Sequence, residues 1–291
     1  MAEGKCCKIC AGIVTYNPNI LLLEKCINSI EDQVEYVILI DNNSTNIEEI
    51  NKLLEKYRKT ELLCNYENKG IAFALNQIAN KAIEYGCEWF LTLDQDSICD
   101  SRMILVYKEY VNIVDVAVIC PNIELRVLNN QTKESMVEAK FEYIDTAITS
   151  GSLIRVDDWK KVRGFWEYLF IDKVDDDFCY AVRNNGKRIL RTNEIILEHE
   201  IGKPVVKKFL WKQYYADNYP KFRYYYIARN TILIHYCYKN TGYNAFKILL
   251  IRGAKIILGE NRKLAKLSFF IRGIFDGIKW ICISGERGIP Y

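Results

Sequence analysis

Strand-like and helix-like patterns of apolar residues alternate along the first hundred residues of the chain. Four apolar runs have the length and composition of buried strands: residues 8–15, 34–40, 61–66 and the run that ends at Asp94. Between them, apolar residues recur every three or four positions, which predicts amphipathic helices at residues 20–32, 47–59 and 71–85. Repeated strand–helix units of this kind predict an α/β fold with a mostly parallel sheet and helices on both faces.

Each of these four strands runs into a polar loop. The loops are TYNP at residues 15–18, DNNS at 41–44, NKG at 68–70 and DQDS at 94–97. Taken singly they could be ordinary turns and helix caps, a role that Ser44 or Asn46 could fill for the next helix. However, the carboxyl ends of parallel strands meet at one edge of the sheet, where open α/β proteins bind ligands. The convergence of four polar loops therefore favours a binding site, and no G-x-G-x-x-G or Walker A sequence competes for it.

The fourth strand, FLTLD, ends in two carboxylates one residue apart, those of Asp94 and Asp96. Burying both without partners would cost several kcal/mol or force them to take up protons. We therefore expect the pair to face water, a cation or a ligand.

A second acidic cluster lies in FIDKVDDDF, at residues 170–178. Apolar residues recur there at helical spacing, at Val174, Phe178 and Val182, and Gly186 is a typical helix end. The aspartates at 175–177 therefore fall in the first turn of a predicted helix. Acidic residues at this position stabilise a helix through its dipole, so the cluster has a purely structural interpretation beside a catalytic one.

The composition is that of an ordinary soluble globular protein, with 50% of the 291 residues hydrophobic and 26% charged. No apolar stretch reaches the roughly 18 residues that span a bilayer, and the N-terminus lacks a signal peptide's apolar region, so a cytoplasmic location is expected. The 11 cysteines are scattered and odd in number, which favours reduced thiols. Cys6, Cys7 and Cys10 lie close together, but no second cysteine or histidine pair follows at zinc spacing to support a metal or redox role.

Charge divides the chain into two parts. From Lys203 onward there are 17 Lys and Arg against 4 Asp and Glu, a net charge of +13, whereas residues 1–202 carry −10. We predict a boundary here, with a basic, aromatic and mainly helical C-terminal region at residues 203–291. Within it, residues 247–279 alternate apolar clusters with Lys and Arg, as in segments that lie on an anionic membrane surface. A protein interface, such as that of a homo-oligomer, is the alternative; nucleic acid is not expected, because no nucleic-acid motif accompanies the charge.

Together these motifs resemble the family-two inverting glycosyltransferases of the GT-A fold, and the bacterial rhamnosyltransferases in particular. The resemblance is carried by TYNP, IDNNS, NKGIAFALN, LDQDS, and FIDKVDDDF followed by RNNG, in this order and at these separations. The segments TSG at 149–151, EHEIG at 198–202 and YYYIARN at 224–230 are similar to the same group. The resemblance covers essentially the whole chain. It implies a GT-A catalytic domain at residues 1–202, with a nucleotide-sugar half at about 1–100 and an acceptor half at about 101–202.

The resemblance gives the aspartate pair a chemical role. In the family, the D-x-D carboxylates hold a divalent cation that bridges the diphosphate of a nucleotide sugar, and oxygen ligands suit Mg²⁺ or Mn²⁺. It implies Asp96 as the direct metal ligand and Asp94 as a contact to the ribose or to a metal-bound water. His199 matches a position that often supplies a further metal or phosphate contact. A histidine satisfied inside the fold is the alternative for that residue.

Nucleotide recognition is expected at the ends of the first strands. Thr15 and Asn17 match positions that contact the base and ribose, and Asp41 can accept a hydrogen bond from the ring N–H of uracil or thymine. Gly70 allows a close backbone approach before a helix whose N-terminal amides could hold an anion. The resemblance extends the nucleotide-sugar contacts to Asn43, Asn68, Gln95, Ser150, Gly151 and Arg229.

Inversion needs a general base that removes the proton of the acceptor hydroxyl as its oxygen attacks the anomeric carbon. By alignment with the family's acidic motif, Asp175 falls on the base position and Asp177 on the second acidic position. Asp172 is the second candidate for the base. The family usually has an arginine near position 181, whereas the nearest arginine here is Arg183.

The sequence therefore predicts a metal-dependent glycosyltransferase that transfers L-rhamnose from dTDP-L-rhamnose to a hydroxyl of a cell-surface glycan or a polyprenyl-diphosphate-linked precursor. It is expected in the cytoplasm, peripheral to the inner face of the bacterial membrane. A relative that uses another pyrimidine-diphosphate sugar and a catalytically silent glycan-binding relative are the alternatives. A nucleotidyltransferase is disfavoured, because no Gly-rich basic loop follows the first strand.

Overall fold

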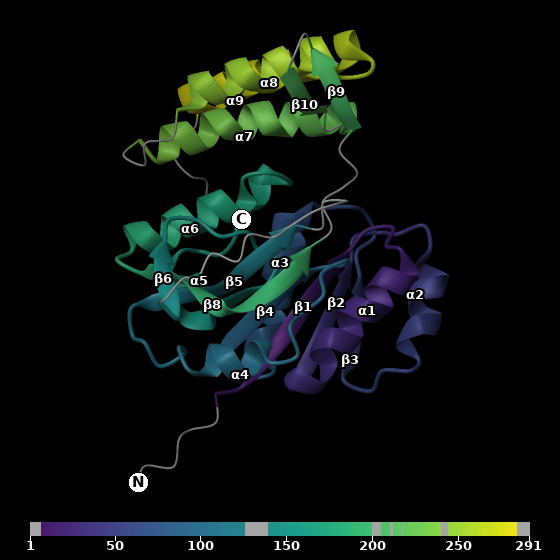
Figure 1. The fold of residues 1–291 in the computed structure, drawn as a ribbon, viewed down its shortest axis with the longest axis vertical. Coiled ribbons are helices and arrows are strands. Elements are labelled where there is room, and N and C mark those ends of the chain that lie inside the picture. The colour runs from purple at the N-terminus through teal and green to yellow at the C-terminus, as the bar shows by residue number, and fades with distance from the viewer. Residues whose placement is uncertain are drawn as a thin grey trace.

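The chain folds into a sheet layer and a C-terminal helical layer, which Figure 1 shows one above the other. The structure is a computed structural model that describes residues 7–125, 139–199, 205–209, 212–216, 218–239 and 244–283. Helices cover both faces of the central sheet, as the sequence predicts.

The central sheet has eight strands in the order β3-β2-β1-β4-β7-β5-β8-β6. Its parallel half is made of the four predicted strands, β1 (Ile9–Thr15), β2 (Tyr36–Asp41), β3 (Thr60–Cys64) and β4 (Trp89–Asp94). The other half is mixed, since β7 (Ser152–Arg155) runs antiparallel to both β4 and β5 (Val116–Leu125). Beyond them, β8 (Arg188–His199) is parallel to β5, and β6 (Phe141–Ile144) is antiparallel to β8 at the edge.

The helices over the sheet form two apolar layers. One face is covered by α1 (Ile20–Ile30), α2 (Ile47–Leu54) and α4 (Met103–Lys108), and the other by α3 (Ile71–Glu84), α5 (Val156–Lys161) and α6 (Val174–Asn184). The α3 helix lies so close to β1 that a Cβ on Gly12 would be 2.2 Å from the side chain of Ile78. The prediction for α2 extended to residue 59, but the helix ends at Leu54 because the chain must turn before β3 begins at Thr60.

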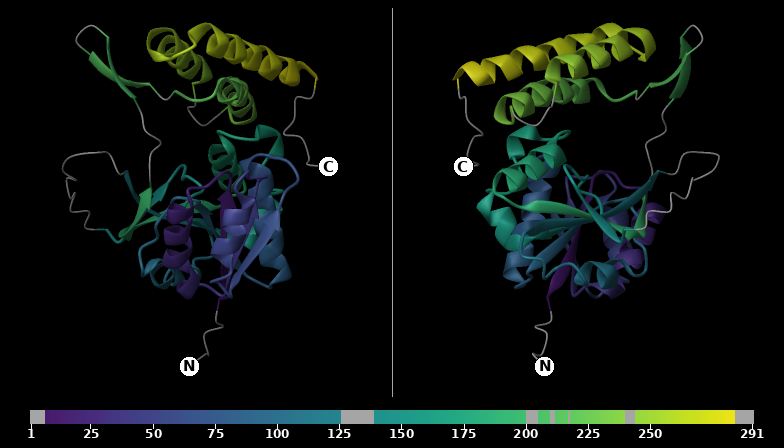
Figure 2. Two further views of the ribbon diagram at one scale, coloured as in Figure 1. Left: turned by 90° about the vertical axis from the view of Figure 1, so that its right-hand side faces the viewer. Right: turned by 60° about the vertical axis from the view of Figure 1, so that its left-hand side comes forward.

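The C-terminal layer contains a hairpin of β9 (Val205–Phe209) and β10 (Lys212–Ala216), followed by α7 (Lys221–Cys237), α8 (Ala245–Gly259) and α9 (Lys263–Ile283). Figure 2 shows α7 facing the sheet layer, with α8 and α9 outside it. Leu233 and Ile234 of α7 belong to the same apolar core as α3 and α6. The predicted boundary at residue 202 lies outside the described residues and stays a prediction. The shared core nevertheless packs α7 against the sheet layer.

Glycines set the distance between the C-terminal helices, and two of them make a matched test. A Cβ on Gly273 would be 2.2 Å from the backbone oxygen of Tyr225, whereas one on Gly253 would be 3.9 Å from its nearest neighbour, Phe270. Gly253→Ala should therefore stabilise the protein by about 0.5–1 kcal/mol through helix propensity, and Gly273→Ala should destabilise it by about 1–3 kcal/mol through overpacking. Chemical denaturation of the two variants measures both; equal shifts would contradict the close α7–α9 contact.

Candidate active site

The ends of β1 and β2 are joined by a buried network around the carboxylate of Asp41. Asp41 is 1% exposed and accepts hydrogen bonds from the hydroxyl of Thr15 (2.9 Å) and from the amide of Ser44 (2.8 Å), as well as from the Ser44 hydroxyl. Thr15 is itself fully buried, so in this structure it orients Asp41. A carboxylate oxygen has about two acceptor sites, so the oxygen that holds the Ser44 amide retains one for a ligand N–H.

The two loops that follow these strands are tied together by Asn17. Its side-chain oxygen accepts hydrogen bonds from the backbone amide (2.8 Å) and the hydroxyl (2.9 Å) of Thr45. The backbone amide of Asn17 donates to Ser44 Oγ (2.7 Å). Asn43 is exposed beside them with a positive φ of 69°. These contacts place Thr15, Asn17 and Asn43 at the same edge of the sheet.

The D-x-D loop is braced by residues that the sequence assigns to the site. The amide of Asp94 donates to Ser150 Oγ (3.1 Å), and the hydroxyls of Ser150 and Ser97 are 2.7 Å apart. Gln95 Oε1 accepts from the amide of Tyr16 (2.9 Å), which links this loop to the end of β1. The amide of Gly151 donates to Thr92 O in β4 (2.7 Å), in a conformation with φ 79°.

The carboxylates of Asp94 and Asp96 are half-buried at this edge. Two half-buried carboxylates with access to solvent form an oxygen donor set that fits Mg²⁺ or Mn²⁺. Across the described residues, the structure gathers no cluster of three or more His, Cys, Asp or Glu that could bind a metal by itself.

His199 is the last residue of β8, and its side chain lies outside the described part of the structure. The backbone of the preceding residue can be placed: Ile98 and Glu198 exchange hydrogen bonds of 3.1 and 3.3 Å. This bridge brings the end of β8 beside the D-x-D loop, although the two segments lie far apart in the sequence.

Gly70 makes a close approach to the chain itself. A Cβ at this position, which has a φ of 86°, would be 2.4 Å from the backbone oxygen of Phe170, and the amide of Ile71 donates to that oxygen (2.7 Å). Asn68 accepts from the amide of Gly70 (2.9 Å). The sequence predicts that the N-terminal amides of α3 could hold an anion. In the structure, the first of them, that of Ile71, binds the loop that precedes α6.

Asp175 lies in the first turn of α6 and is half-buried. Burial raises the pKa of its carboxyl to about 6, and the neighbouring charge of Asp176 adds to the rise, while Lys173 opposes it. Lys173 in turn binds Asp176 with a distance of 2.7 Å between Nζ and Oδ2. Asp175 is therefore a carboxylate that is ionised at neutral pH but unusually basic.

The other two candidate aspartates are engaged with the C-terminal layer. Arg223 of α7 forms a bidentate ion pair with Asp172, with a shortest distance of 3.0 Å. Asp177 is 0% exposed and accepts a hydrogen bond from the hydroxyl of Tyr238 (2.7 Å). The sequence analysis missed both partners, because nothing local marks an arginine or tyrosine some 50 to 60 residues away as their contact.

A cavity of about 330 Å³ opens beside Asp175, between the start of α6 and helices α7 and α8. Asp177 is not among the residues that line it. The hydroxyl of Thr231, which is fully buried in its wall, has no hydrogen-bond partner within the described residues. The cavity combines carboxylates, arginines and aliphatic side chains, among them Ile71, Asp172, Asp175, Ile227, Thr231 and Arg252.

Arg183 and Arg229 both pair with groups of this chain. Arg183 pairs with Asp145 at 2.7 Å on the surface of α6. Arg229 is only 5% exposed, and its guanidinium donates to the backbone oxygens of Tyr168 and Leu169. It therefore contacts the acidic loop in this structure rather than an open nucleotide site.

The described cysteines are all free thiols. Cys10 is buried, and its pKa is raised well above the usual value by a hydrogen bond with Cys87 and by burial. Cys7 is half-buried, and Cys6 lies outside the described residues. The prediction of reduced thiols is consistent with this arrangement.

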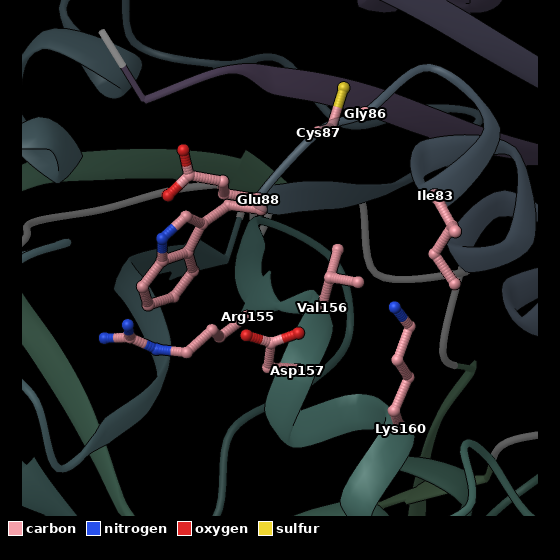
Figure 3. Close-up of a pocket in the computed structure, with 9 residues that line it drawn as sticks. Ile83, Gly86, Cys87, Glu88, Arg155, Val156, Asp157 and Lys160 are labelled. Atoms are coloured by element: carbon pink, nitrogen blue, oxygen red, sulfur yellow. The ribbon is translucent and has the colours of Figure 1, made fainter. Parts of the chain in front are cut away.

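A second cavity, of about 250 Å³, lies beside α5 and the first residues of β4 (Figure 3). It is separated from the D-x-D loop by the full length of β4, because it adjoins the first residues of that strand. Figure 3 shows Glu88, Arg155, Asp157 and Lys160 around it. It belongs to the amino edge of the sheet and takes no part in the site described above.

Comparison with known proteins gives consistent results. The sequence model of Glycosyl transferase family 2 matches residues 10–159. The dTDP-rhamnosyl transferase RfbF of Shigella flexneri is 28% identical over 300 residues, covering 96% of this chain and 98% of that protein.

Solved structures show the same fold at low sequence identity. TarS 1–349 from S. aureus is similar with a TM-score of 0.54 and 14% identity, over 96% of this chain and 75% of that one. GalNAc-T7, solved with UDP, GalNAc and Mn²⁺, is similar with a TM-score of 0.60 and 11% identity, over 99% of this chain and 59% of that one. These likenesses confirm the predicted GT-A fold. The family match, which covers more than half of the chain, establishes that the chain belongs to glycosyl transferase family 2.

Proposed function

We propose that this glycosyltransferase transfers L-rhamnose from dTDP-L-rhamnose, with inversion, to a hydroxyl of a cell-surface glycan precursor. The observation that carries the mechanism is Asp175, a half-buried carboxylate with a pKa of about 6 beside a cavity next to the donor edge. The choice of donor is supported by the similarity to a relative named as a dTDP-rhamnosyl transferase, which the chain covers almost end to end.

The donor would bind along the carboxyl edge of β1, β2 and β4. Asp41, oriented by Thr15 and Ser44, would accept the ring N–H of thymine with its remaining acceptor site. Asp96 would ligate Mg²⁺ or Mn²⁺, and Asp94 would contact the ribose or a metal-bound water. When bound, the cation stabilises the negative charge that develops on the departing diphosphate.

The acceptor would enter the cavity between α6 and the C-terminal helices. Its hydroxyl loses a proton to the Asp175 carboxylate as its oxygen attacks the anomeric carbon, and the bond from that carbon to the diphosphate breaks on the opposite face. A raised pKa makes Asp175 a stronger base than an ordinary aspartate while leaving it ionised at neutral pH. Asp172 is a weaker candidate, because both of its oxygens are engaged by Arg223.

The assignment of the base predicts a separation between Asp175→Asn and Asp172→Asn. Asp175→Asn should lower kcat by roughly 10²-fold or more with little change in donor affinity, because a base that acts on a proton in flight stabilises mainly the transition state. Steady-state kinetics and donor titration measure the two effects. Loss of kcat in Asp172→Asn alone would reverse the assignment, and changes of only a few-fold in both variants would reduce the cluster to a helix cap.

The same assignment fixes the pH dependence. The kcat of the unaltered enzyme should fall as the pH drops through about 6, because protonated Asp175 cannot accept the acceptor's proton. The carboxyl has a pKa near 4 in an unfolded chain, so the folded state binds the extra proton between about pH 4 and 6. Stability should therefore decline as pH rises across that interval, and Asp175→Asn should remove this part of the decline.

Donor and metal are tested together by a thermal-shift panel of dTDP-L-rhamnose and UDP-sugars, each with Mn²⁺, Mg²⁺ or chelator. A ligand that binds only the folded state raises the Tm, so dTDP-L-rhamnose with metal should give the largest rise. Asp96→Ala should abolish turnover and the metal-dependent part of the shift. A larger rise in Tm with a UDP-sugar would show that the donor is that sugar nucleotide. Full activity in excess chelator would show that no metal is needed. A lack of turnover with every donor would favour a catalytically silent glycan-binding protein.

The outer surface of the C-terminal layer favours contact with an anionic membrane. On α8, Phe246, Leu250 and Ile257 are 73%, 58% and 53% exposed, and they lie on the helix face opposite Ile248 and Arg252, which line the cavity. Exposed apolar residues continue on α9, beside the exposed basic residues Lys247, Lys263, Arg272 and Lys279. None of the helices in the described ranges has both the length and the apolar character needed to cross a bilayer. A surface that lies on the membrane would bring the cavity close to a polyprenyl-linked acceptor.

Vesicle binding tests this surface. The protein should bind anionic vesicles much more strongly than neutral ones, and salt should weaken binding because exposed charges are screened over roughly 10 Å at 0.1 M. Leu250→Glu should reduce binding, whereas Leu21→Glu should not, because Leu21 is also exposed, at 69%, but lies on α1 of the sheet layer. Equal binding to neutral and anionic vesicles, or equal effects of the two variants, would favour an interface between protein chains.

A further inference from the structure

The loop that leads into α6 has an unusual backbone. Phe170, Asp172 and Lys173 all have positive φ values, of 64°, 63° and 68°, although none of them is glycine. Residues other than glycine are strained in this conformation, and it persists only where surrounding contacts hold the backbone in place. The loop ends at Lys173, two residues before Asp175, so whatever holds it also positions the proposed base.

Asn230 of α7 supplies the densest of these contacts. Its buried side-chain nitrogen lies within hydrogen-bond distance of three backbone oxygens of the loop, those of Leu169 (2.9 Å), Ile171 (2.8 Å) and Asp172 (2.9 Å). Its side-chain oxygen accepts from Arg229 Nε (3.0 Å). Because a guanidinium can only donate, this bond turns the oxygen of Asn230 toward Arg229 and the nitrogen toward the loop.

Arg229 completes the contact on the same loop. Its guanidinium donates to the backbone oxygens of Tyr168 and Leu169 and lies 4.2 Å from the ring of Tyr168 and 4.8 Å from that of Tyr226. The ring of Tyr226 stacks on Phe170 at 4.8 Å. Three residues of the motif YYYIARN, namely Tyr226, Arg229 and Asn230, therefore contact the six residues that precede α6.

The loop is also held at two further points. Arg223, two turns before Asn230 on α7, binds the Asp172 carboxylate. From the sheet layer, the amide of Ile71 binds the oxygen of Phe170. The loop is therefore fixed between α3 and α7, and α7 provides the larger share of the hydrogen bonds.

We propose that Asn230 and Arg229 are positioning residues for the general base: they hold residues 168–172 so that Asp175 meets the acceptor hydroxyl. The inference rests on the glycosyl transfer proposed above, and it replaces the nucleotide contact expected of Arg229. Reacting groups must be aligned closely, and a displacement of about 1 Å by a distant change can cost 10²-fold in rate.

Two kinetic readouts separate positioning from a donor contact. Asn230→Ala and Arg229→Lys should each lower kcat by at least roughly 10-fold, while the affinity for dTDP in a binding titration changes by less than about 3-fold. Turnover is followed as nucleoside diphosphate released from the donor, with p-nitrophenyl monosaccharides as acceptors. Asn230→Ala also opens a cavity, so Asn230→Asp is the second variant: it keeps the size and the bond from Arg229 but turns acceptor oxygens toward the loop.

A double-mutant cycle shows whether Asn230 acts through the base. In the Asp175→Asn background, Asn230→Asp should lower the residual rate by less than about 2-fold, because the group it positions is already gone. Tyr224→Phe is the matched control from the same motif: its ring is buried with Ile256 and Phe270 on the side of α8 and α9, so the variant should leave kcat within 2-fold.

Three results would overturn the proposal. A loss of dTDP affinity in parallel with kcat would show that Arg229 contacts the nucleotide. Full additivity in the double mutant would show that Asn230 has only a structural role. A kcat within 2-fold of the unaltered enzyme in every variant would show that these contacts do not position the base. Failure of the proposed function is separate, since it appears in the unaltered enzyme, which would then turn over a different donor or none.

Discussion

A carboxylate that stays ionised while partly withdrawn from water is the constraint around which the rest of this structure is arranged. Burial, together with the neighbouring charge of Asp176, raises the pKa of Asp175 to about 6, and a further rise would protonate it at neutral pH. The site must therefore hold Asp175 at a fixed depth. The sheet cannot do this by itself, because Asp175 begins a helix rather than ending a strand.

The depth of Asp175 is set by contacts that converge on the preceding loop from two layers. Gly70 lets α3 approach Phe170 within hydrogen-bond distance, and a side chain at that position would collide with the loop. From the other side, Asn230 and Arg229 occupy four of the loop's backbone oxygens. The carboxyl edge of the sheet and Asp175 are consequently parts of one connected arrangement, since Gly70 ends the loop that leads from β3 into α3.

Much of the parallel half of the sheet could be predicted from the sequence, because its signals are local. The four strands from β1 to β4 are short apolar runs, and each places its polar residues at the carboxyl edge simply by ending there. The same logic predicts that Asp94 and Asp96 lie at the edge with access to solvent. The resemblance to a family of glycosyltransferases added roles to these positions, and the family match confirms the membership.

The remainder of the site depends on contacts that no local pattern encodes. Asp172 and Asp177 look alike in the sequence, yet one binds Arg223 at the cavity and the other is buried against Tyr238. Arg229 was assigned to the nucleotide because a motif marks it, while its partner Asn230 carried no assignment. The pairing of β8 with the D-x-D loop through Ile98 and Glu198 likewise joins segments a hundred residues apart.

The uneven charge of the chain acquires a more specific meaning in the structure. Arg223 and Arg229 point inward: Arg223 binds the Asp172 carboxylate, and Arg229 donates to backbone oxygens of the same loop. Neither guanidinium is therefore available to an external anion. The exposed lysines and arginines of α8 and α9 face outward beside apolar side chains. The basic residues of this region therefore fall into two groups: Arg223 and Arg229 bind the loop before α6, and the exposed lysines and arginines of α8 and α9 lie on the outer surface.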